Sequence, residues 1–217
     1  MKKLVLFAAL AVAPFAHAAS DPALDKVLHQ LDVASTKFQS AEADFRRENY
    51  ERVVRETTEE DGFVYIQRRG STPEMGAVIT KKAGKPIHNV MQFHNGTLDV
   101  FDGASVKHID AKANRSQYES YLTLGFGGSG KDLAAQWNVT LQGMETIDGV
   151  QTAKLLLVAK DPAVRDRFSS VTIWVDPTRG VSLRQIFEMP SHDKITSYYS
   201  NIRYNQKVNT SKYKLPK

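Results

Sequence analysis

The feature that most constrains this chain is a long succession of short segments in which apolar and polar residues alternate. Val171, Ile173 and Val175 show the pattern well, and a period of two is typical of a strand with one buried face. Asn95-Gly96, between two such segments, is a strong hairpin signal. The pattern favours an antiparallel sheet. Strands are expected at residues 41–57, 62–68, 76–81, 88–94, 97–101, 106–110, 138–143, 152–160, 170–176, 181–188 and 194–204.

One helix is expected before the strands, over residues 22–38. Asp21-Pro22 is a helix start, with a capping side chain followed by proline at the first helical position. Apolar residues then recur at helical spacing: Leu24, Val27, Leu28, Leu31, Ala34 and Phe38. A helix with one apolar stripe must lie on another element. We therefore predict a mainly β protein, with one antiparallel sheet curved around this helix in a single domain, residues 19–217.

Residues 1–18 have the pattern of an export leader. Met1-Lys2-Lys3 is positively charged, residues 4–15 are almost entirely apolar, and Ala16-His17-Ala18 is a small-x-small cleavage site. The apolar run is shorter than a membrane-spanning helix, so a short membrane anchor is the less favoured alternative. The chain has no cysteine that could be acylated. We expect a periplasmic protein without a membrane anchor.

The composition argues against several classes of function. Without cysteine there is no thiol chemistry and no cysteine-ligated zinc. The net charge of +5 is too mild to indicate nucleic-acid binding, and the leader contributes two of the lysines. The histidines lack metal-ligand spacing: His29, His88, His94, His108 and His192. We expect a protein that is not an enzyme and has no cofactor, metal or nucleic-acid partner.

Residues 125–131, Gly-Phe-Gly-Gly-Ser-Gly-Lys, match the spacing of a phosphate-binding loop. Such a loop needs Ser or Thr next, where this chain has Asp132, and the surrounding pattern is antiparallel rather than βαβ. We favour a hinge between two short helices, residues 115–124 and 131–137, with Asp132 capping the second. A nucleotide-using enzyme is the alternative.

The apolar residues of these two helices have two interpretations. They are Tyr118, Tyr121, Leu122, Leu124, Phe126, Leu133 and Trp137. They either fill the interior of the barrel as core residues or form a lid over a cavity. The neighbouring glycines favour a lid that moves. Arg68 ends an apolar strand, where its guanidinium could point into the mouth of a barrel and donate hydrogen bonds to several carbonyls. The acids Glu59, Glu60 and Asp61 are expected to be solvated beside a turn, and residues 210–217 to form an irregular tail.

Several short motifs, taken in order, resemble the LolA-type periplasmic lipoprotein carriers and the wider lipoprotein-sorting family. They are the helix running into a long strand (residues 24–55), Gly62 to Arg68, Asn95-Gly96-Thr97-Leu98, Trp174-Val175-Asp176 to Gly180, Tyr199-Ser200-Asn201-Ile202 and Lys214-Leu215-Pro216. The glycine-rich stretch marks a divergent branch. The resemblance implies an incomplete antiparallel β-barrel wrapped around the N-terminal helix, with a small helical lid that Arg68 hydrogen-bonds.

The resemblance also implies a function. Such a carrier binds acyl chains of lipoproteins or other lipids, accepts them from an inner-membrane transporter and passes them to an outer-membrane receptor. We expect a monomer. Residues predicted for the cavity and lid are Leu28, Phe38, Phe45, Phe63, Tyr65, Arg68, Phe93, Leu98, Tyr121, Leu122, Leu133, Trp137, Val171 and Ile173. A periplasmic lipid-sensing or regulatory module on the same fold is the alternative.

Overall fold

The computed structural model of the protein describes residues 21–70, 72–112 and 121–216. The predicted leader, residues 1–18, lies outside this range, and so does most of the helix predicted over residues 115–124. Among the described residues, no helix combines the length and the apolar character needed to cross a membrane.

An 11-stranded antiparallel sheet makes up most of the structure, in the order β6-β5-β4-β3-β2-β1-β11-β10-β9-β8-β7. The strands are β1 (Ser40–Glu51), β2 (Glu56–Arg69), β3 (Thr72–Lys82), β4 (Lys85–His94), β5 (Thr97–Phe101), β6 (Val106–Asp110), β7 (Trp137–Ile147), β8 (Val150–Ala159), β9 (Ser170–Asp176), β10 (Val181–Glu188) and β11 (Lys194–Tyr204). The helices are α1 (Pro22–Lys37), α3 (Gly130–Gln136), α4 (Pro162–Arg165) and the 3₁₀ helix η2 (Thr210–Tyr213). Pairing of β1 with β11 joins the two halves of the chain.

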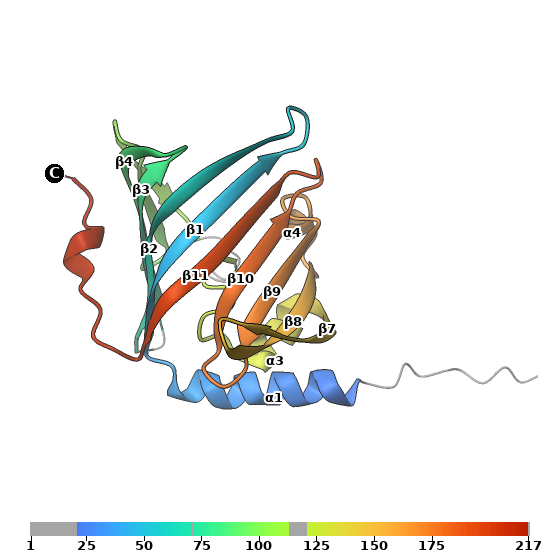
Figure 1. Ribbon diagram of the computed structural model, residues 1–217. Coiled ribbons are helices and arrows are strands. Elements are labelled where there is room, and N and C mark those ends of the chain that lie inside the picture. Colours follow the sequence, from blue (N-terminus) through green and yellow to red (C-terminus); the bar gives the residue numbers. More distant parts are fainter. Residues whose placement is uncertain (1–20, 71, 113–120, 217) are drawn as a thin grey trace, which may run out of the picture.

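The sheet is strongly curved and stays open, with β6 and β7 as its two edges in the described part of the chain. Helix α1 runs across one end of the strands, and α3 packs beside it (Figure 1). The fold class is therefore confirmed as an incomplete antiparallel barrel with a helix across one end.

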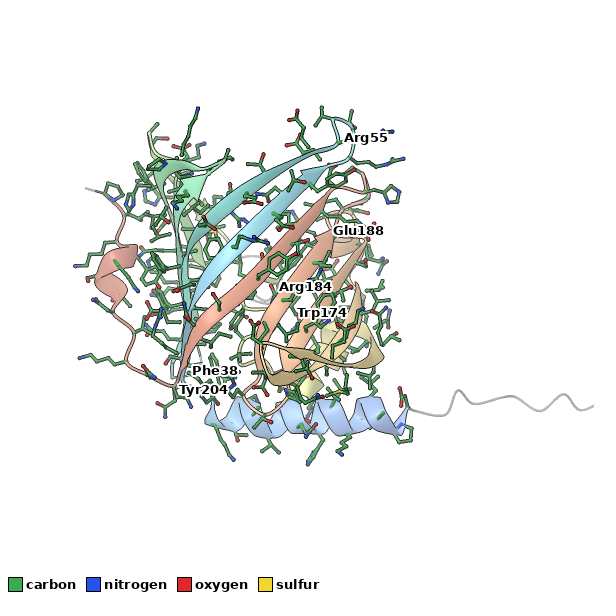
Figure 2. The ribbon with its side chains drawn as sticks, in the orientation of Figure 1. Phe38, Arg55, Trp174, Arg184, Glu188 and Tyr204 are labelled. Carbon is green, nitrogen blue, oxygen red and sulfur yellow. The ribbon has the colours of Figure 1, made fainter. Side chains whose placement is uncertain are left out.

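The sequence explains where α1 begins and what it buries. The Asp21 side chain accepts a hydrogen bond from the Ala23 N–H at 2.9 Å, and Pro22 is the first helical residue. The buried residues Val27, Leu31 and Ala34 follow helical spacing. The helix ends at Phe38, which is extended and contacts the Tyr204 ring at a centroid distance of 6.1 Å (Figure 2). This contact fixes the corner between α1 and the centre of the sheet.

The core has one cluster in each half of the sheet. Phe45, Ile66 and Phe93 belong to the cluster over β1–β4. Leu155, Val171 and Ile173 belong to the cluster over β8 and β9, which also receives Val27 and Leu31 of α1. The alternation seen at residues 171–175 places these apolar side chains on the inner face. Helix α1 thus closes one end of the interior.

The strand predicted over residues 41–57 is wrong at its end. Strand β1 stops at Glu51, residues 52–55 turn with Arg55 at a φ of 58°, and β2 starts at Glu56. Arg55 lies at the tip of this hairpin (Figure 2). The turn contains neither Gly nor Asn, the residues that usually signal a positive φ, so the sequence pattern does not reveal it.

Glu59, Glu60 and Asp61 lie inside the longer β2 and not beside a turn as predicted. Glu59 is exposed, in line with the prediction that these acids are solvated, but Glu60 is buried. Arg47, its register partner on β1, donates to its carboxylate at 2.8 Å through Nε. A buried carboxylate is stable only with such a partner. The prediction failed because charge in a run of acids does not identify the face of the strand.

The C-terminal residues are not an irregular tail as predicted. Helix η2 packs on the outer face of β3 and β4, and Tyr213 is fully buried there. The Tyr213 ring meets the Tyr65 ring edge-on at 4.6 Å, and its hydroxyl donates to Glu42 at 2.7 Å. Lys212 and Arg203 also pair with Glu42. A carboxylate on β1 therefore fastens the C-terminal segment to the sheet.

We expect Tyr213→Phe to lower the free energy of unfolding by about 1–3 kcal/mol, because the substitution removes a donor from a buried carboxylate. Urea unfolding measures the change. Tyr50→Phe is the matched control, since Tyr50 is on the same strand as Glu42 and its hydroxyl makes no hydrogen bond with the described residues. Equal stability of Tyr213→Phe and the wild type would contradict the assigned role of the hydroxyl.

The stability should also depend on pH through Glu42. Burial alone raises the pKa of Glu42, but hydrogen bonds from Lys212, Tyr213 and Arg203 outweigh it and hold the pKa below its ordinary value of 4.5. A depressed folded-state pKa adds stability above the ordinary pKa, and this stability is lost as the pH falls through the folded value. We expect Glu42→Gln to reduce the loss of unfolding free energy below about pH 5, measured by urea unfolding. Identical pH profiles for the two proteins would refute this.

Candidate functional site

A cavity of about 420 Å³ lies on the concave face of the sheet. Strands β1–β5 form one wall and β10 and β11 the other, and residues 121–126 contribute from the interior. Its lining is largely apolar and rich in aromatic side chains: Phe45, Phe101, Tyr121, Phe126, Phe168, Phe187 and Tyr199. Polar side chains enter it from Arg47, Asn89, Asp102, Gln185 and Ser197. We call this space the main cavity. Its size and lining suit a small apolar ligand.

Residues 121–128, here called the inner segment, divide the interior. Leu124 lines both the main cavity and a second cavity of about 290 Å³. Phe126 lines the main cavity and a third space beside Arg68. The inner segment is therefore the partition between separate cavities.

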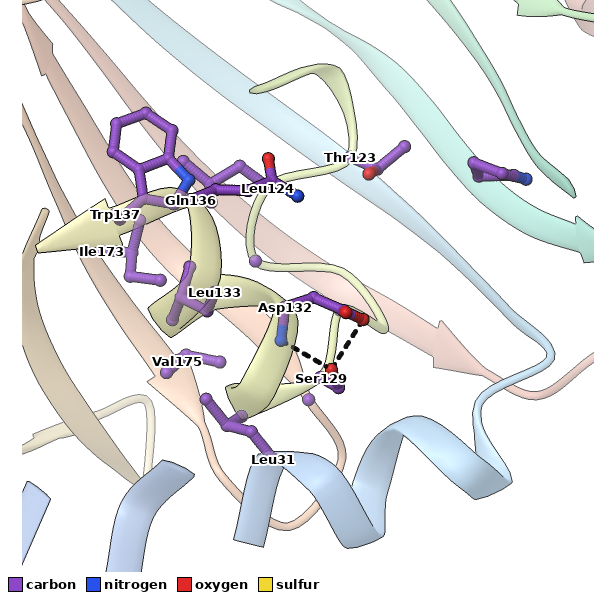
Figure 3. A pocket seen from close by; sticks show the side chains of 14 residues that line it. Leu31, Thr123, Leu124, Ser129, Asp132, Leu133, Gln136, Trp137, Ile173 and Val175 are labelled. Carbon is purple, nitrogen blue, oxygen red and sulfur yellow. Dashed lines mark hydrogen bonds between the residues drawn. The ribbon is translucent and has the colours of Figure 1, made fainter. Parts of the chain in front are cut away.

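The second cavity lies between α1, α3 and β9 (Figure 3). Leu31, Trp137 and Ile173 supply apolar wall from α1, β7 and β9. At the start of α3, the Ser129 hydroxyl accepts from the Asp132 N–H at 2.9 Å and donates to the Asp132 carboxylate at 2.6 Å. Ser129, not Asp132 as predicted, is therefore the cap of α3, because its side chain satisfies the free N–H of the first turn.

Strand β10 and Gly180, the residue before it, hold the inner segment by hydrogen bonds. The Ser182 N–H donates to the Gly125 carbonyl at 2.7 Å, and the Gly127 N–H donates to the Gly180 carbonyl at 2.8 Å. The buried Gln185 amide donates to the Leu124 carbonyl at 2.6 Å. These bonds satisfy polar groups that the inner segment carries into an apolar interior.

Arg68 joins three parts of the structure. Its guanidinium donates to the Ser35 carbonyl of α1 at 2.7 Å and to the Gly127 carbonyl of the inner segment at 2.5 Å. It also lies 5.8 Å from the centre of the Phe38 ring. The two carbonyl contacts have the geometry that the sequence leads us to expect for this residue. Through Arg68, β2 connects α1 to the inner segment.

The glycines serve close packing against the sheet and α1. Gly125 has a φ of +74°, and a Cβ there would lie 2.1 Å from the Ser182 hydroxyl. Gly127 has a φ of +72°, and a Cβ there would lie 2.3 Å from the Phe38 ring. Larger residues fit neither position. The N–H groups of Phe126, Gly127 and Lys131 are hydrogen-bonded within the protein, so they do not converge on a phosphate. The phosphate-loop interpretation is therefore abandoned.

The residues predicted for the cavity and lid occupy several environments. Phe45, Tyr121 and Leu122 line the main cavity, and Leu133, Trp137 and Ile173 line the second. Phe38 and Arg68 line the third space. Phe93, Leu98 and Val171 are buried core residues, and Leu28 lies on α1 next to Gly130. The two short helical regions therefore do contribute to the interior, but the predicted set is not one site.

Phe63 and Tyr65 need correction, because they lie on the outer face of β2 beneath the C-terminal segment. Val64 and Ile66 face the main cavity instead. Residues 63–66 are all apolar, so alternation does not distinguish the two faces of this strand. The register partners on β3, Met75 and Ala77, also line the cavity and were missed. Once the register of β2 and β3 is known, Met75 and Ala77 can be identified because they lie opposite Ile66 and Val64.

Among the described residues, no three His, Asp or Glu side chains gather closely enough to hold a metal ion. No protein-family profile and no curated protein sequence matches the chain. Similarity is found instead among solved structures.

An uncharacterized conserved protein from Thermus thermophilus is 11% identical with a TM-score of 0.54, over 90% of this chain and 95% of that chain. MucB from Pseudomonas aeruginosa, solved in complex with MucA, is 12% identical with a TM-score of 0.54, over 89% and 61%. The lipoprotein LppX from Mycobacterium tuberculosis is 20% identical with a TM-score of 0.51, over 88% and 99%. This chain shares their fold. The match spans about three fifths of the MucB chain. The resemblance found in the sequence motifs is thus confirmed at the level of the fold.

Gly127→Ala should loosen the inner segment, because the added Cβ collides with the Phe38 ring and the backbone has a positive φ. We expect its melting temperature to fall by on the order of 5 °C. Gly128→Ala is the matched control, since a Cβ at Gly128 meets no atom within 4 Å and its φ lies outside the positive range. Thermal unfolding of both variants provides the test. Equal melting temperatures would show that Gly127 has no special packing role.

Proposed function

We propose that this protein is a periplasmic carrier that holds acyl chains in the interior of its open sheet. The proposal rests on the apolar main cavity beneath the inner segment. Such a space adds nothing to the stability of a sheet that already has its own core, so it is best explained by a ligand. The shared fold with the lipoprotein LppX supports it. The predicted leader supports a periplasmic location.

The energetics suit a carrier that must also release its cargo. Burial of an acyl chain is worth about 0.8 kcal/mol per methylene, so a sixteen-carbon chain contributes on the order of 10 kcal/mol. That value alone corresponds to an affinity between micromolar and nanomolar. Leu122, Leu124 and Phe126 of the inner segment occupy the same interior. Return of these side chains competes with the cargo and so favours release.

The proposed route is from an inner-membrane transporter to an outer-membrane receptor. This direction comes from the resemblance to lipoprotein carriers, in which cargo leaves one membrane and enters another. The protein then acts by binding and not by chemistry.

A regulatory module is the second candidate, and the likeness to MucB favours it. MucB was solved in complex with MucA, so this fold is compatible with a protein partner. Here the interior would sense a lipid and change the affinity for a membrane partner. Transfer of lipid between membranes separates this candidate from the carrier, because a sensor has no need to deliver what it binds.

Native mass spectrometry of protein extracted from the periplasm tests the proposal. We expect a population with the added mass of one acyl-containing molecule, which disappears when lipid is extracted with solvent. The extracted protein should then take up lipid from donor vesicles and pass it to acceptor vesicles. Extracted protein without bound lipid, together with no uptake from vesicles, would refute the proposal.

The carrier also predicts a role for Arg68. Arg68→Leu removes two hydrogen bonds that hold the inner segment, so we expect uptake of a fluorescent fatty acid to become about tenfold faster. Arg52→Leu is the matched control, because Arg52 is exposed in the β1–β2 turn. Stopped-flow fluorescence gives the rates. Unchanged uptake and release in Arg68→Leu would remove Arg68 from the mechanism.

A further inference from the structure

A polar row crosses the concave face at the edge of the main cavity. Arg47 on β1 is in register with Glu60 on β2, and Glu60 is in register with Lys82 on β3. Arg47 donates to one oxygen of the Glu60 carboxylate through Nε and Nη2, at 2.8 and 2.5 Å. The Lys82 ammonium lies 3.3 Å from the other oxygen. We call these three residues the rim cluster.

The rim cluster has more positive than negative charge. Burial alone raises the pKa of Glu60, but Arg47 and Lys82 outweigh it and hold the pKa below its ordinary value, so this carboxylate stays ionised. Two cations therefore share one anion. The bonds to Glu60 leave Nη1 of Arg47 as a further donor. Asp102, the acidic residue lining the main cavity, is paired with Lys107 at 2.9 Å.

Arg47 connects the rim cluster to both the cavity and the solvent. Its guanidinium lies 5.7 Å from the centre of the Phe45 ring, and both side chains line the main cavity. Its side chain is 29% exposed, whereas that of Glu60 is 7% exposed. The arginine therefore stands where an apolar interior meets water. An amphiphile bound in the cavity places its polar head at such a boundary.

The volume of the main cavity limits the number of chains. A methylene group takes about the volume of a water molecule in the liquid, roughly 30 Å³. With the inner segment in place, a volume of about 420 Å³ therefore accommodates about fourteen methylene groups, which is most of one sixteen-carbon chain, and not several chains side by side.

We infer that the main cavity takes a single-chain lipid with an anionic head, whose carboxylate or phosphate is bound by Arg47 with support from Lys82. This inference rests on the proposed carrier function and specifies its ligand. Arginine favours both head groups because its planar donors match their oxygen atoms. Glu60 positions the guanidinium and competes with the head for it.

Calorimetric titration of lipid-free protein tests the inference with three ligands that share a sixteen-carbon chain. They are palmitate, palmitoyl lysophosphatidic acid and neutral monopalmitoylglycerol. We expect the wild type to bind both anions about tenfold more tightly than the neutral lipid, the value of a hydrogen bond to a charged group. The relative affinity of palmitate and the lysophospholipid distinguishes the carboxylate from the phosphate as the preferred head.

Substitutions of Arg47 and Glu60 in the rim cluster should have opposite effects on the binding of anionic lipids. Arg47→Gln should lose the preference for anions, and Arg47→Lys should keep part of it. Glu60→Gln should bind palmitate more tightly than the wild type, because both cations then lose the negative charge that competes with the head group. A purely structural ion pair predicts weaker binding for Glu60→Gln, since its loss only disturbs the wall. Arg46→Gln is the matched control, because Arg46 is next in the chain but lies over the Tyr198 ring outside the cavity.

The outcomes separate this inference from the proposed function. Binding of none of the three lipids would refute the carrier itself. Equal binding of anionic and neutral lipids, or an unchanged preference in Arg47→Gln, would refute only the anionic-head inference. Weaker palmitate binding by Glu60→Gln than by the wild type would also refute only the anionic-head inference. Circular dichroism of each variant verifies that the fold is retained.

Discussion

An open, curved sheet with an apolar concave face cannot stay uncovered in water, and the rest of this structure follows from that constraint. Helix α1 covers one end with Val27 and Leu31. The inner segment covers the middle, where Leu124 and Phe126 are buried. This cover is incomplete and leaves the main cavity. The same apolar surface that stabilises the fold is thus available to a ligand when the cover is displaced.

Hydrogen bonds from two sides attach the inner segment. Strand β10 holds it through Ser182 and Gln185, and Arg68 holds it from the other side. Each bond contributes about 1 kcal/mol net, so their sum is comparable to the gain from burying part of an acyl chain. These hydrogen bonds alone therefore do not prevent an exchange between the inner segment and a ligand. The rim cluster adds a charged contact at the edge of the same cavity, where Arg47 meets both water and the apolar wall.

Much of this fold could be predicted from local patterns, because alternation, the cap at Asp21 and the Asn95-Gly96 turn each depend on neighbouring residues. The predictions that failed concern residues whose environment is decided by residues distant in the sequence. The faces of Phe63 and Tyr65 are decided by the C-terminal segment, which lies over a strand that is apolar on both sides. The burial of Glu60 is decided by Arg47 across the sheet. For the same reason, several cavity residues become identifiable only when the strand register is known.

The proposed function requires that the inner segment and an acyl chain exclude each other from the interior. Because the chain has no cysteine, spin labels can be attached at Gly128→Cys in the inner segment and at Thr57→Cys on β2 without other changes. Pulsed electron–electron double resonance then gives the distance between the two spin labels with and without palmitate. We expect a second distance whose population grows in proportion to bound lipid. The same single distance at full occupancy would contradict it.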